Sequence, residues 1–358
     1  MNDLHCEARI AIARPTDYIE RIADRLLSFD AHGEESGTRL RFRFPFGSAV
    51  LDLADEAMAV SLDASNADRL ARLKDIVTTA IEVHARKANP RIVWRGDLAG
   101  DRRLAQFRRM QVAGSRDVTP HMRRVTLRGD NLARFAEFGG LHVRLLFPTP
   151  EVPEPVWPEA GPNGLPVWPD ESRRAPARVY TIRRLDVAAG LIEIDFVMHG
   201  DDGIGSAWAA SARPGDGVGL MGPLGRPVRH ARWYVLGADE TGLPALARIL
   251  EGLPPETEGS AFIEVADAAE EQAIARPRGF AVHWIHRNGI PPGEDPRLAE
   301  TVCAVARPAQ GTCFSWFAAE TEAAKRVREH WRGHQGLGRD ETLAAAYWRR
   351  GALGPMAG

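Results

Sequence analysis

Residues 178–183, RVYTIR, bring a guanidinium, a phenol and a hydroxyl close together in one predicted strand. Taken alone, this stretch predicts only a β-strand with a β-branched residue, an aromatic ring and a terminal charge. Arg178 and Tyr180 would point to one side of the strand and Thr181 to the other, although an edge or kinked strand can present Tyr180 and Thr181 together.

A second stretch with possible chemistry is HGDDGIGSAWA at residues 199–209. Its glycines allow backbone amides to approach a phosphate closely. Ser206 is expected to cap a helix, and Trp208 is expected to pack on that helix. His199 and Gly200 precede this turn, and a lone His199 would be an ordinary strand-end histidine.

A third stretch, GADETGLPA at residues 237–245, lies in a predicted turn between a buried strand and a helix. It is not the G-x-G-x-x-G fingerprint of dinucleotide-binding folds. Asp239, Glu240 and Thr241 follow the strand, where acidic residues are otherwise simply helix starts. Because ligands of parallel sheets bind at the carboxyl ends of the strands, this turn and Glu320 should face one crevice.

The elements that position these motifs are predicted in three domains. The first, residues 1–95, is a separate α+β domain. Helical spacing follows Pro15, and alternating apolar residues at 40–46 predict a half-buried strand. Ser65 with Asp68 resembles a helix cap ahead of a long second helix. The expected order is strand, helix, three strands, helix, with the helices on one antiparallel sheet. No catalytic constellation is found here.

A second predicted domain, residues 102–228, contains many short strands separated by turn signals, which indicates a small antiparallel β-barrel. It is interrupted by residues 148–176, which contain nine prolines. Proline lacks the amide donor and fixes φ, so this segment is expected to be neither a helix nor a central strand. Its two tryptophans, Trp157 and Trp168, favour a loop that packs on something.

The third predicted domain, residues 230–352, alternates apolar strands with helix-compatible stretches, which implies an α/β unit with a parallel sheet. A chain of 358 residues with a net charge of −2 lacks the basic field of a general nucleic-acid binder. No apolar stretch approaches a membrane span and no signal peptide is visible, so we expect a cytoplasmic protein. Its three cysteines cannot by themselves hold a four-cysteine metal site, and none is predicted.

The ordered series of RVYTIR, HGDDGIGSAWA, PGDGVGLMGPLG, GADETGLPA, FSWFAAE and YWRRG resembles the siderophore-interacting proteins. These are FAD-dependent ferric-siderophore reductases of the ferredoxin-NADP reductase superfamily. The resemblance covers roughly residues 102–352, and residues 1–95 are similar to a small domain of unassigned function that is fused ahead of such reductases. The expected fold is therefore an α+β domain, a FAD-binding barrel and a NAD(P)H-binding α/β domain.

The resemblance also implies cofactor contacts. Tyr180 would flank the isoalloxazine, Thr181 would bond near N5, and Arg178 would meet the phosphates. The second motif has Ile204-Gly205 where the family usually has Pro-Ala, which predicts a looser phosphate turn. The residues expected at FAD from that motif are His199, Gly200, Ser206 and Trp208. The residues expected beside the nicotinamide are Asp239, Glu240, Thr241 and Glu320.

A ferric siderophore is often anionic and bulky, so a basic pocket beside the flavin is expected, with arginine suited to carboxylate and catecholate oxygens. Arg144 matches a basic family position, and Arg349 or Arg350 is a second candidate. The family often has a cation inside the Gly-Pro-x-Gly turn, where this chain has Leu224, with Arg226 two residues later. Asp267 follows one predicted strand, where an acid would disfavour a 2′-phosphate, and Arg287 follows the next. The sequence therefore does not decide between NADPH and NADH as the donor.

The predicted reaction passes electrons from NADPH or NADH through FAD to Fe(III) in a siderophore and releases Fe(II). No side chain is assigned a catalytic acid–base role, because the cofactor carries the chemistry. Two alternatives remain open: a flavin reductase that serves a protein such as a ferredoxin, and a siderophore-binding protein without catalysis.

Overall fold

The computed structural model describes residues 3–199, 203–225 and 228–352. The chain divides into two compact units, of which the first joins residues 1–107 to residues 152–175 and the second contains residues 108–151 and 176–358. Most of the proline-rich segment thus belongs with the N-terminal domain, although both of its ends lead into barrel strands. Among the described residues, no helix is long and apolar enough to cross a bilayer.

The N-terminal part of the first unit is an antiparallel sheet with strand order β2-β3-β4-β5-β1-β6. Both helices share one apolar core with the alternate buried side chains of the strands, so they cover the same face. The elements are β1 (Leu4–Ala11), α1 (Thr16–Leu27), β2 (His32–Ser36), β3 (Arg39–Phe44), β4 (Gly47–Ala54), β5 (Ala57–Ala64), α2 (Ala67–His84) and β6 (Arg95–Gly96). A 3-10 turn, η1 (Arg86–Ala88), follows α2.

Two local predictions for this domain were wrong. Strand β2 was not expected, because all of its residues are exposed and it therefore shows no apolar alternation. Its pairing with β3 alone holds it at the sheet edge. The cap of α2 is Asn66, whose side chain accepts a hydrogen bond from the Arg69 amide, rather than the expected Ser65 with Asp68.

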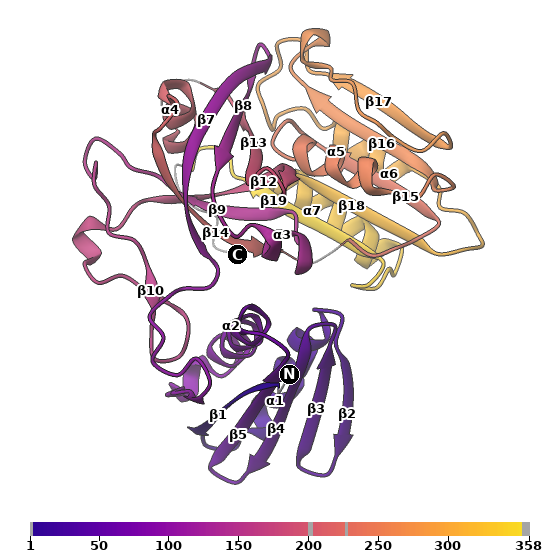
Figure 1. The fold of residues 1–358 in the computed structure, drawn as a ribbon. Helices are drawn as coiled ribbons and strands as arrows, with labels where there is room; N and C mark the ends of the chain where they lie inside the picture. The colour runs from indigo at the N-terminus through magenta and orange to yellow at the C-terminus, as the bar shows by residue number, and fades with distance from the viewer. Residues whose placement is uncertain (1–2, 200–202, 226–227, 353–358) are drawn as a thin grey trace. The chain divides into compact units, whose positions relative to one another are not determined.

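The second unit begins with a closed barrel of strand order β12-β13-β8-β7-β14-β9, which confirms the predicted barrel (Figure 1). Its strands are β7 (Phe107–Thr119), β8 (Met122–Arg128), β9 (His142–Leu146), β12 (Ala177–Asp186), β13 (Leu191–Val197) and β14 (Gly217–Leu224). Two short helices, α3 (Ala133–Glu137) and α4 (Ile204–Ser211), accompany them.

The barrel is followed by a five-stranded parallel sheet of order β17-β16-β15-β18-β19, which confirms the predicted α/β unit. Helix α5 packs in one apolar cluster and helices α6 and α7 in another, so helices cover both faces of the sheet (Figure 1). The elements are β15 (Trp233–Ala238), α5 (Leu243–Gly252), β16 (Glu258–Val265), η3 (Ala268–Glu270), β17 (Phe280–His286), α6 (Arg297–Ala304), β18 (Cys313–Glu320), α7 (Thr321–Glu329), η4 (His330–His334) and β19 (Thr342–Trp348).

Polar contacts join the parallel-sheet domain to the barrel. Arg183 of β12 donates two hydrogen bonds to Glu251 of α5, at 2.7 and 2.6 Å. Arg248 of the same helix donates to the Ile182 carbonyl at 3.0 Å. Helix α5 therefore holds the strand that carries the RVYTIR motif, directly after Thr181.

Candidate functional site

The first site element is β12, which pairs with β13 on one side and β9 on the other. The Tyr180 ring faces the barrel interior, with its centroid 4.4 Å from that of Phe196 and 6.1 Å from that of Phe147. A methyl group added to Gly205 of α4 would lie 1.7 Å from the Tyr180 hydroxyl. Burial raises the pKa of this phenol, and the nearby Arg178 opposes the rise. Tyr180 thus stays neutral and closes the barrel against α4.

The opposite side of β12 has a different character. Val179 is 52% exposed, and its cross-strand partner on β9 is the exposed Arg144. Thr181 is only 5% exposed, and its hydroxyl makes no hydrogen bond to any residue in the described part of the chain. An open apolar side chain, a cation and an unused hydroxyl therefore share this outer face. Sequence reasoning missed Val179. Strand alternation could have identified it, because Tyr180 and Ile182 face inward and Val179 must then face outward.

The second site element is the turn before α4. An added Cβ on Gly203 would lie 2.7 Å from both the His199 ring and the Ser206 hydroxyl, so only glycine fits between them. Gly203 is also the N-cap of α4, and it offers no side-chain cap. The prediction that Ser206 caps α4 was wrong. Ser206 lies in the first turn of the helix and donates to the Gly203 carbonyl at 2.9 Å. Gly200 lies outside the described residues.

Two further predicted residues of this region are half-buried. Trp208 packs toward the barrel, with its ring centroid 5.3 Å from Phe147 and 5.8 Å from Phe196. Arg178 donates to the neighbouring Ala177 carbonyl, and no carboxylate bond to its guanidinium is found among the described residues. Arg178 therefore keeps its charge available for an anion.

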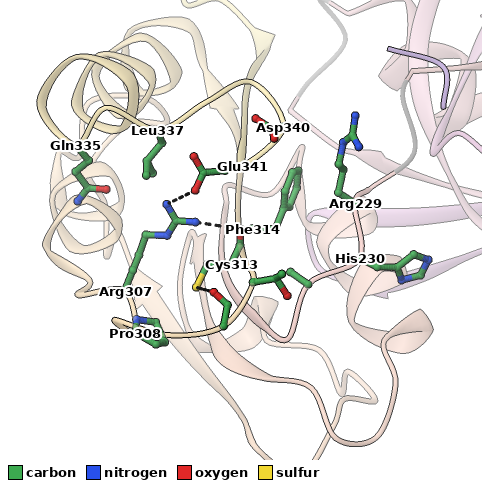
Figure 2. A pocket seen from close by; sticks show the side chains of 13 residues that line it. Arg229, His230, Arg307, Pro308, Cys313, Phe314, Gln335, Leu337, Asp340 and Glu341 are labelled. Atoms are coloured by element: carbon green, nitrogen blue, oxygen red, sulfur yellow. Dashed lines mark hydrogen bonds and ion pairs between the residues drawn. The ribbon is translucent and has the colours of Figure 1, made fainter. Parts of the chain in front are cut away.

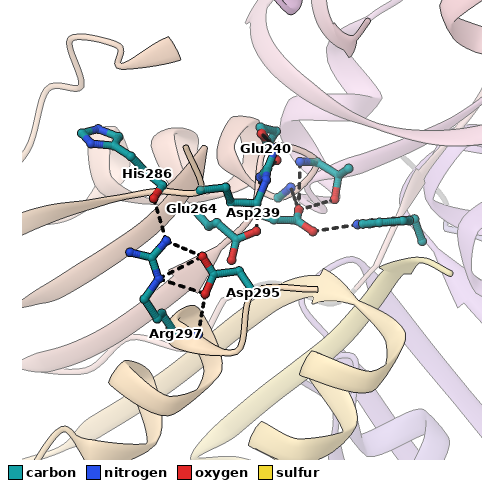
Figure 3. Close-up of polar contacts among 10 residues, drawn as sticks. Asp239, Glu240, Glu264, His286, Asp295 and Arg297 are labelled. Atoms are coloured by element: carbon teal, nitrogen blue, oxygen red, sulfur yellow. Dashed lines mark hydrogen bonds and ion pairs between the residues drawn. The ribbon is translucent and has the colours of Figure 1, made fainter. Parts of the chain in front are cut away.

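At the carboxyl end of β15, Asp239 is nearly fully buried and already saturated (Figure 3). One carboxylate oxygen accepts from the Thr241 amide and hydroxyl at 2.9 and 2.6 Å, and the other accepts from the Trp348 indole at 2.7 Å. Burial raises the pKa of Asp239, while the bonds from Thr241 and Trp348 oppose that rise. Asp239 therefore shapes the turn and presents the half-buried Thr241.

Next to it, Glu240 and Glu264 both form ion pairs with the buried Arg287. The Arg287 guanidinium donates to Glu240 at 2.7 and 2.5 Å and to Glu264 at 3.2 Å. Burial, followed by the charge of Asp239, raises the pKa of Glu264 to about 7, against the opposing effect of Arg287. Arg287 is therefore neutralised by protein carboxylates. Sequence reasoning missed Glu264, whose place in a buried strand gave no sign of its ion pair.

Glu320 ends β18 and serves as the N-cap of α7, where its side chain accepts from the Glu322 amide. Its other oxygen accepts from the Arg350 amide at 3.2 Å. The Arg350 guanidinium is bound to Glu294 at 2.6 Å, whereas Arg349 is exposed and its side chain has no partner among the described residues. Of the two adjacent arginines, Arg349 is thus the available one. Arg226 lies outside the described residues.

A histidine–tyrosine pair that the sequence did not single out joins β9 to β19. His142 Nε2 lies 2.5 Å from the Tyr347 hydroxyl, and the rings meet edge to face. Burial, assisted by Arg248, lowers the pKa of His142 to about 4, so the imidazole is neutral near pH 7. The pair ties down two strand segments, each two residues from a candidate cation, Arg144 or Arg349. Tyr347 begins the quoted YWRRG motif and His142 lies two residues before Arg144, and their aromatic and polar character was the available signal.

A pocket of about 630 Å3 lies elsewhere, where β18 and β19 begin (Figure 2). Its lining includes Arg229, Arg307 and Glu341, and Arg307 donates to Glu341 at 3.4 Å and to the Cys313 carbonyl at 3.0 Å. This is the amino end of the parallel strands, whereas nucleotide ligands bind at the carboxyl end. The pocket is therefore separate from the candidate site.

Three sequence families match the chain, domain by domain. Residues 111–227 match the siderophore-interacting FAD-binding domain, and residues 231–351 match the siderophore-interacting protein family. Residues 7–95 match a family of uncharacterized proteins conserved in bacteria, DUF2218. A closed barrel that carries a glycine cradle before α4 and is followed by a parallel nucleotide-type sheet defines a flavin-binding reductase architecture. The chain belongs to the siderophore-interacting protein family.

Named relatives share this part of the chain. The ferric vibriobactin reductase ViuB of Vibrio cholerae is 30% identical over 65% of this chain and 86% of its own length. The NADPH-dependent ferric-chelate reductase of Escherichia coli is 32% identical over 68% of this chain and 93% of its own. The crystal structure of a siderophore utilization protein from T. fusca matches with a TM-score of 0.58 and 37% identity, covering 69% of this chain and 94% of that one.

Proposed function

We propose that this protein is an FAD-dependent ferric-siderophore reductase that takes its electrons from NADPH or NADH. The observation that carries the proposal is the outer face of β12 and β9, where exposed Val179, the unused Thr181 hydroxyl and Arg144 lie together. A siderophore-binding protein without catalysis would have no need of an unpaired hydroxyl at this place. The named reductase relatives support the same activity.

The residues present fit a flavin dinucleotide. The Gly203 cradle admits no side chain, and the positive end of the α4 dipole would face an anion bound there. Arg178 would supply a cation to the pyrophosphate, with His199 and Ser206 beside Gly203; Gly200, which lies outside the described residues, stays a proposed contact. When bound, FAD accepts a hydride from the nicotinamide and supplies two single electrons, one to each of two Fe(III) ions.

The protein's own residues would orient this cofactor. Thr181 would donate its free hydroxyl near N5, and Val179 would cover an apolar part of the ring. Tyr180 and Trp208 would support the cofactor from the barrel side, with Tyr180 held in place by Phe196. The neutral phenol and indole exclude water without adding charge to the site.

On the nicotinamide side, we propose that Thr241 contacts the donor while Asp239 and Glu320 shape the walls of the crevice. Glu240 would hold Arg287 away from the ligand, because the guanidinium is already bound by two carboxylates. A 2′-phosphate would then need another cation, so the ratio of NADPH to NADH efficiency is a direct test of this crevice. A reduced nicotinamide donor also supports a cytoplasmic location.

The ferric siderophore would bind between Arg144 and Arg349, with Arg226 as a third candidate. Arginine stays charged and offers planar donors to carboxylate or catecholate oxygens. After one-electron reduction, Fe(II) is held less tightly by hard oxygen ligands and leaves.

The test is an anaerobic absorption spectrum of the purified protein. We expect visible flavin bands that bleach on addition of NADPH or NADH and return on addition of a ferric siderophore, with Fe(II) trapped by a chromogenic chelator. Return of the bands with oxidised ferredoxin alone would favour a protein acceptor. A colourless protein that takes up no added FAD would reject the enzyme altogether.

A further inference from the structure

The N-terminal domain presents two buried polar groups to the proline-rich segment. Thr78 of α2 is fully buried and Trp94 is 3% exposed. The carbonyl of Asn163 accepts hydrogen bonds from the Trp94 indole at 3.0 Å and from the Thr78 hydroxyl at 3.1 Å. Without this carbonyl the indole N–H would retain only Thr78, at 3.2 Å, and the Thr78 proton would have no acceptor of its own. Buried donors without acceptors are costly, so this site is built for a carbonyl.

The segment that supplies the carbonyl is a small hairpin of β10 (Glu159–Ala160) and β11 (Pro166–Val167). Its turn is closed by a bond from the Gly161 amide to the Leu165 carbonyl at 2.8 Å. The Asn163 side chain accepts from the Leu165 amide and donates to Glu82 of α2 at 3.2 Å. The tip is thus preformed and fits one helix face.

Further contacts secure the remainder of residues 152–175, which we call the docked hairpin. Ala160 donates to the carbonyl of Arg102, in the linker that leaves the N-terminal domain, and Arg102 forms an ion pair with Glu159. The Trp157 ring lies 5.5 Å from that of Phe107. Arg174 lies 3.7 Å from the centroid of Trp168.

The chain path connects the docked hairpin to the candidate site. It leaves the barrel after β9 and returns to it at β12, and the Phe147 amide bonds the Pro176 carbonyl at its base. Strands β9 and β12 pair with each other from Ala177–Leu146 to Thr181–His142. The two ends of the docked hairpin are therefore continuous in the backbone with both strands that line the proposed flavin face.

We propose that the N-terminal domain binds the docked hairpin and restrains it. This restraint keeps β9 and β12 in the register that cofactor binding requires. The domain's ligand is a segment of this chain, seated on Thr78 and Trp94, rather than a separate partner. Thr78 and Trp94 are therefore positioning residues that act through the hairpin. The inference concerns FAD binding and not siderophore turnover. It can therefore be tested independently of the proposed siderophore substrate.

The test uses the full-length protein with Thr78→Val and Trp94→Phe combined. Thr78→Val keeps the shape of its side chain, whereas Trp94→Phe also makes the buried ring system smaller; both remove the donors to Asn163. The matched control is Thr79→Val, the same change on the same helix at a residue without a hydrogen bond to the hairpin among the described residues. Hydrogen exchange of residues 152–175 and the FAD dissociation constant are measured for each protein.

We expect the double variant to exchange at least about fivefold faster in residues 152–175, since each lost bond contributes about 1 kcal/mol. We expect its FAD dissociation constant to rise several-fold, with Thr79→Val like wild type in both measurements. Asn163→Ala provides a second route that leaves the N-terminal core intact, because it removes only the hairpin's own side-chain bonds to Leu165 and Glu82. Asn163→Ala is expected to speed hydrogen exchange of residues 152–175 and to raise the FAD dissociation constant, as the double variant does.

Two results would overturn the proposal. One is unchanged hydrogen exchange of residues 152–175 in the double variant and in Asn163→Ala. The other is faster exchange with wild-type affinity for FAD, which would show that the hairpin is held but does not restrain the cofactor strands.

Discussion

Replacing Gly205 with alanine tests whether α4 must approach Tyr180 closely. Glycine in a helix is ordinarily about 1 kcal/mol less favourable than alanine, so helix propensity alone predicts stabilisation. The added methyl, however, would lie 1.7 Å from the Tyr180 hydroxyl and 2.8 Å from the ring carbon that bears it. The phenol would have to retreat by about 1.7 Å to reach an ordinary contact of 3.4 Å.

The barrel gives Tyr180 little room to retreat. Its ring already lies at a centroid distance of 4.4 Å from fully buried Phe196, and Phe147 borders it edge to face. Overpacking of this kind costs about 1–3 kcal/mol, which exceeds the gain in helix propensity at the upper end of that range. We expect Gly205→Ala to lose up to about 2 kcal/mol of stability and to bind FAD about tenfold more weakly.

Gly252 of α5 is the matched control, because an added methyl there meets no atom within 4 Å. Gly252→Ala should gain up to about 1 kcal/mol and leave FAD binding unchanged. Urea unfolding and fluorescence titration with FAD measure both variants. If Gly205→Ala matches Gly252→Ala in stability and in FAD affinity, the close approach of Tyr180 to α4 does not matter and the reasoning fails.

Four further outcomes follow from the site. Thr181→Val should keep wild-type stability in urea, because its hydroxyl has no partner among the described residues, yet weaken FAD about fivefold by titration; reduced stability would contradict this. Arg349→Ala should raise the KM for an anionic ferric siderophore about tenfold in steady-state assays and leave the nicotinamide KM unchanged. Because burial raises the pKa of Glu264 from 4.5 to about 7, the folded protein holds a proton that the unfolded chain has lost. Wild-type stability should therefore fall as pH rises between these values, by at most about 3 kcal/mol, and Glu264→Gln should lack this decline in urea unfolding at pH 5 and pH 8. Tyr347→Phe should lose about 1–3 kcal/mol in urea unfolding, because buried His142 loses its partner, and an unchanged midpoint would count against that bond.

Short-range patterns were enough to predict the architecture. Alternation in the barrel strands, strand–helix alternation after residue 230 and the proline content of residues 148–176 each depend on neighbours in sequence. The exposed edge strand β2 was missed because none of its residues is buried, and among the described strands it pairs only with β3. Asn66 rather than Ser65 caps α2 because the cap is set by where the backbone turns, which a pattern locates only to within a residue or two.

The sequence by itself determined which chemical groups the site could use: the arginine, aromatic ring and hydroxyl of RVYTIR, the glycines before α4 and the acids after β15. Only the tertiary structure decided which of them are free. Asp239 accepts a hydrogen bond from Trp348, Glu240 binds Arg287, and Glu320 accepts from a helix amide. Val179 and Thr181, in contrast, lie on the outer face of β12 and are available to a ligand. It also decided that the proline-rich segment rests on α2, since Thr78 and Asn163 are 85 residues apart. The physical reason is that hydrogen bonds and ion pairs between distant segments leave no periodic trace in the chain, yet they determine which polar groups remain for a ligand.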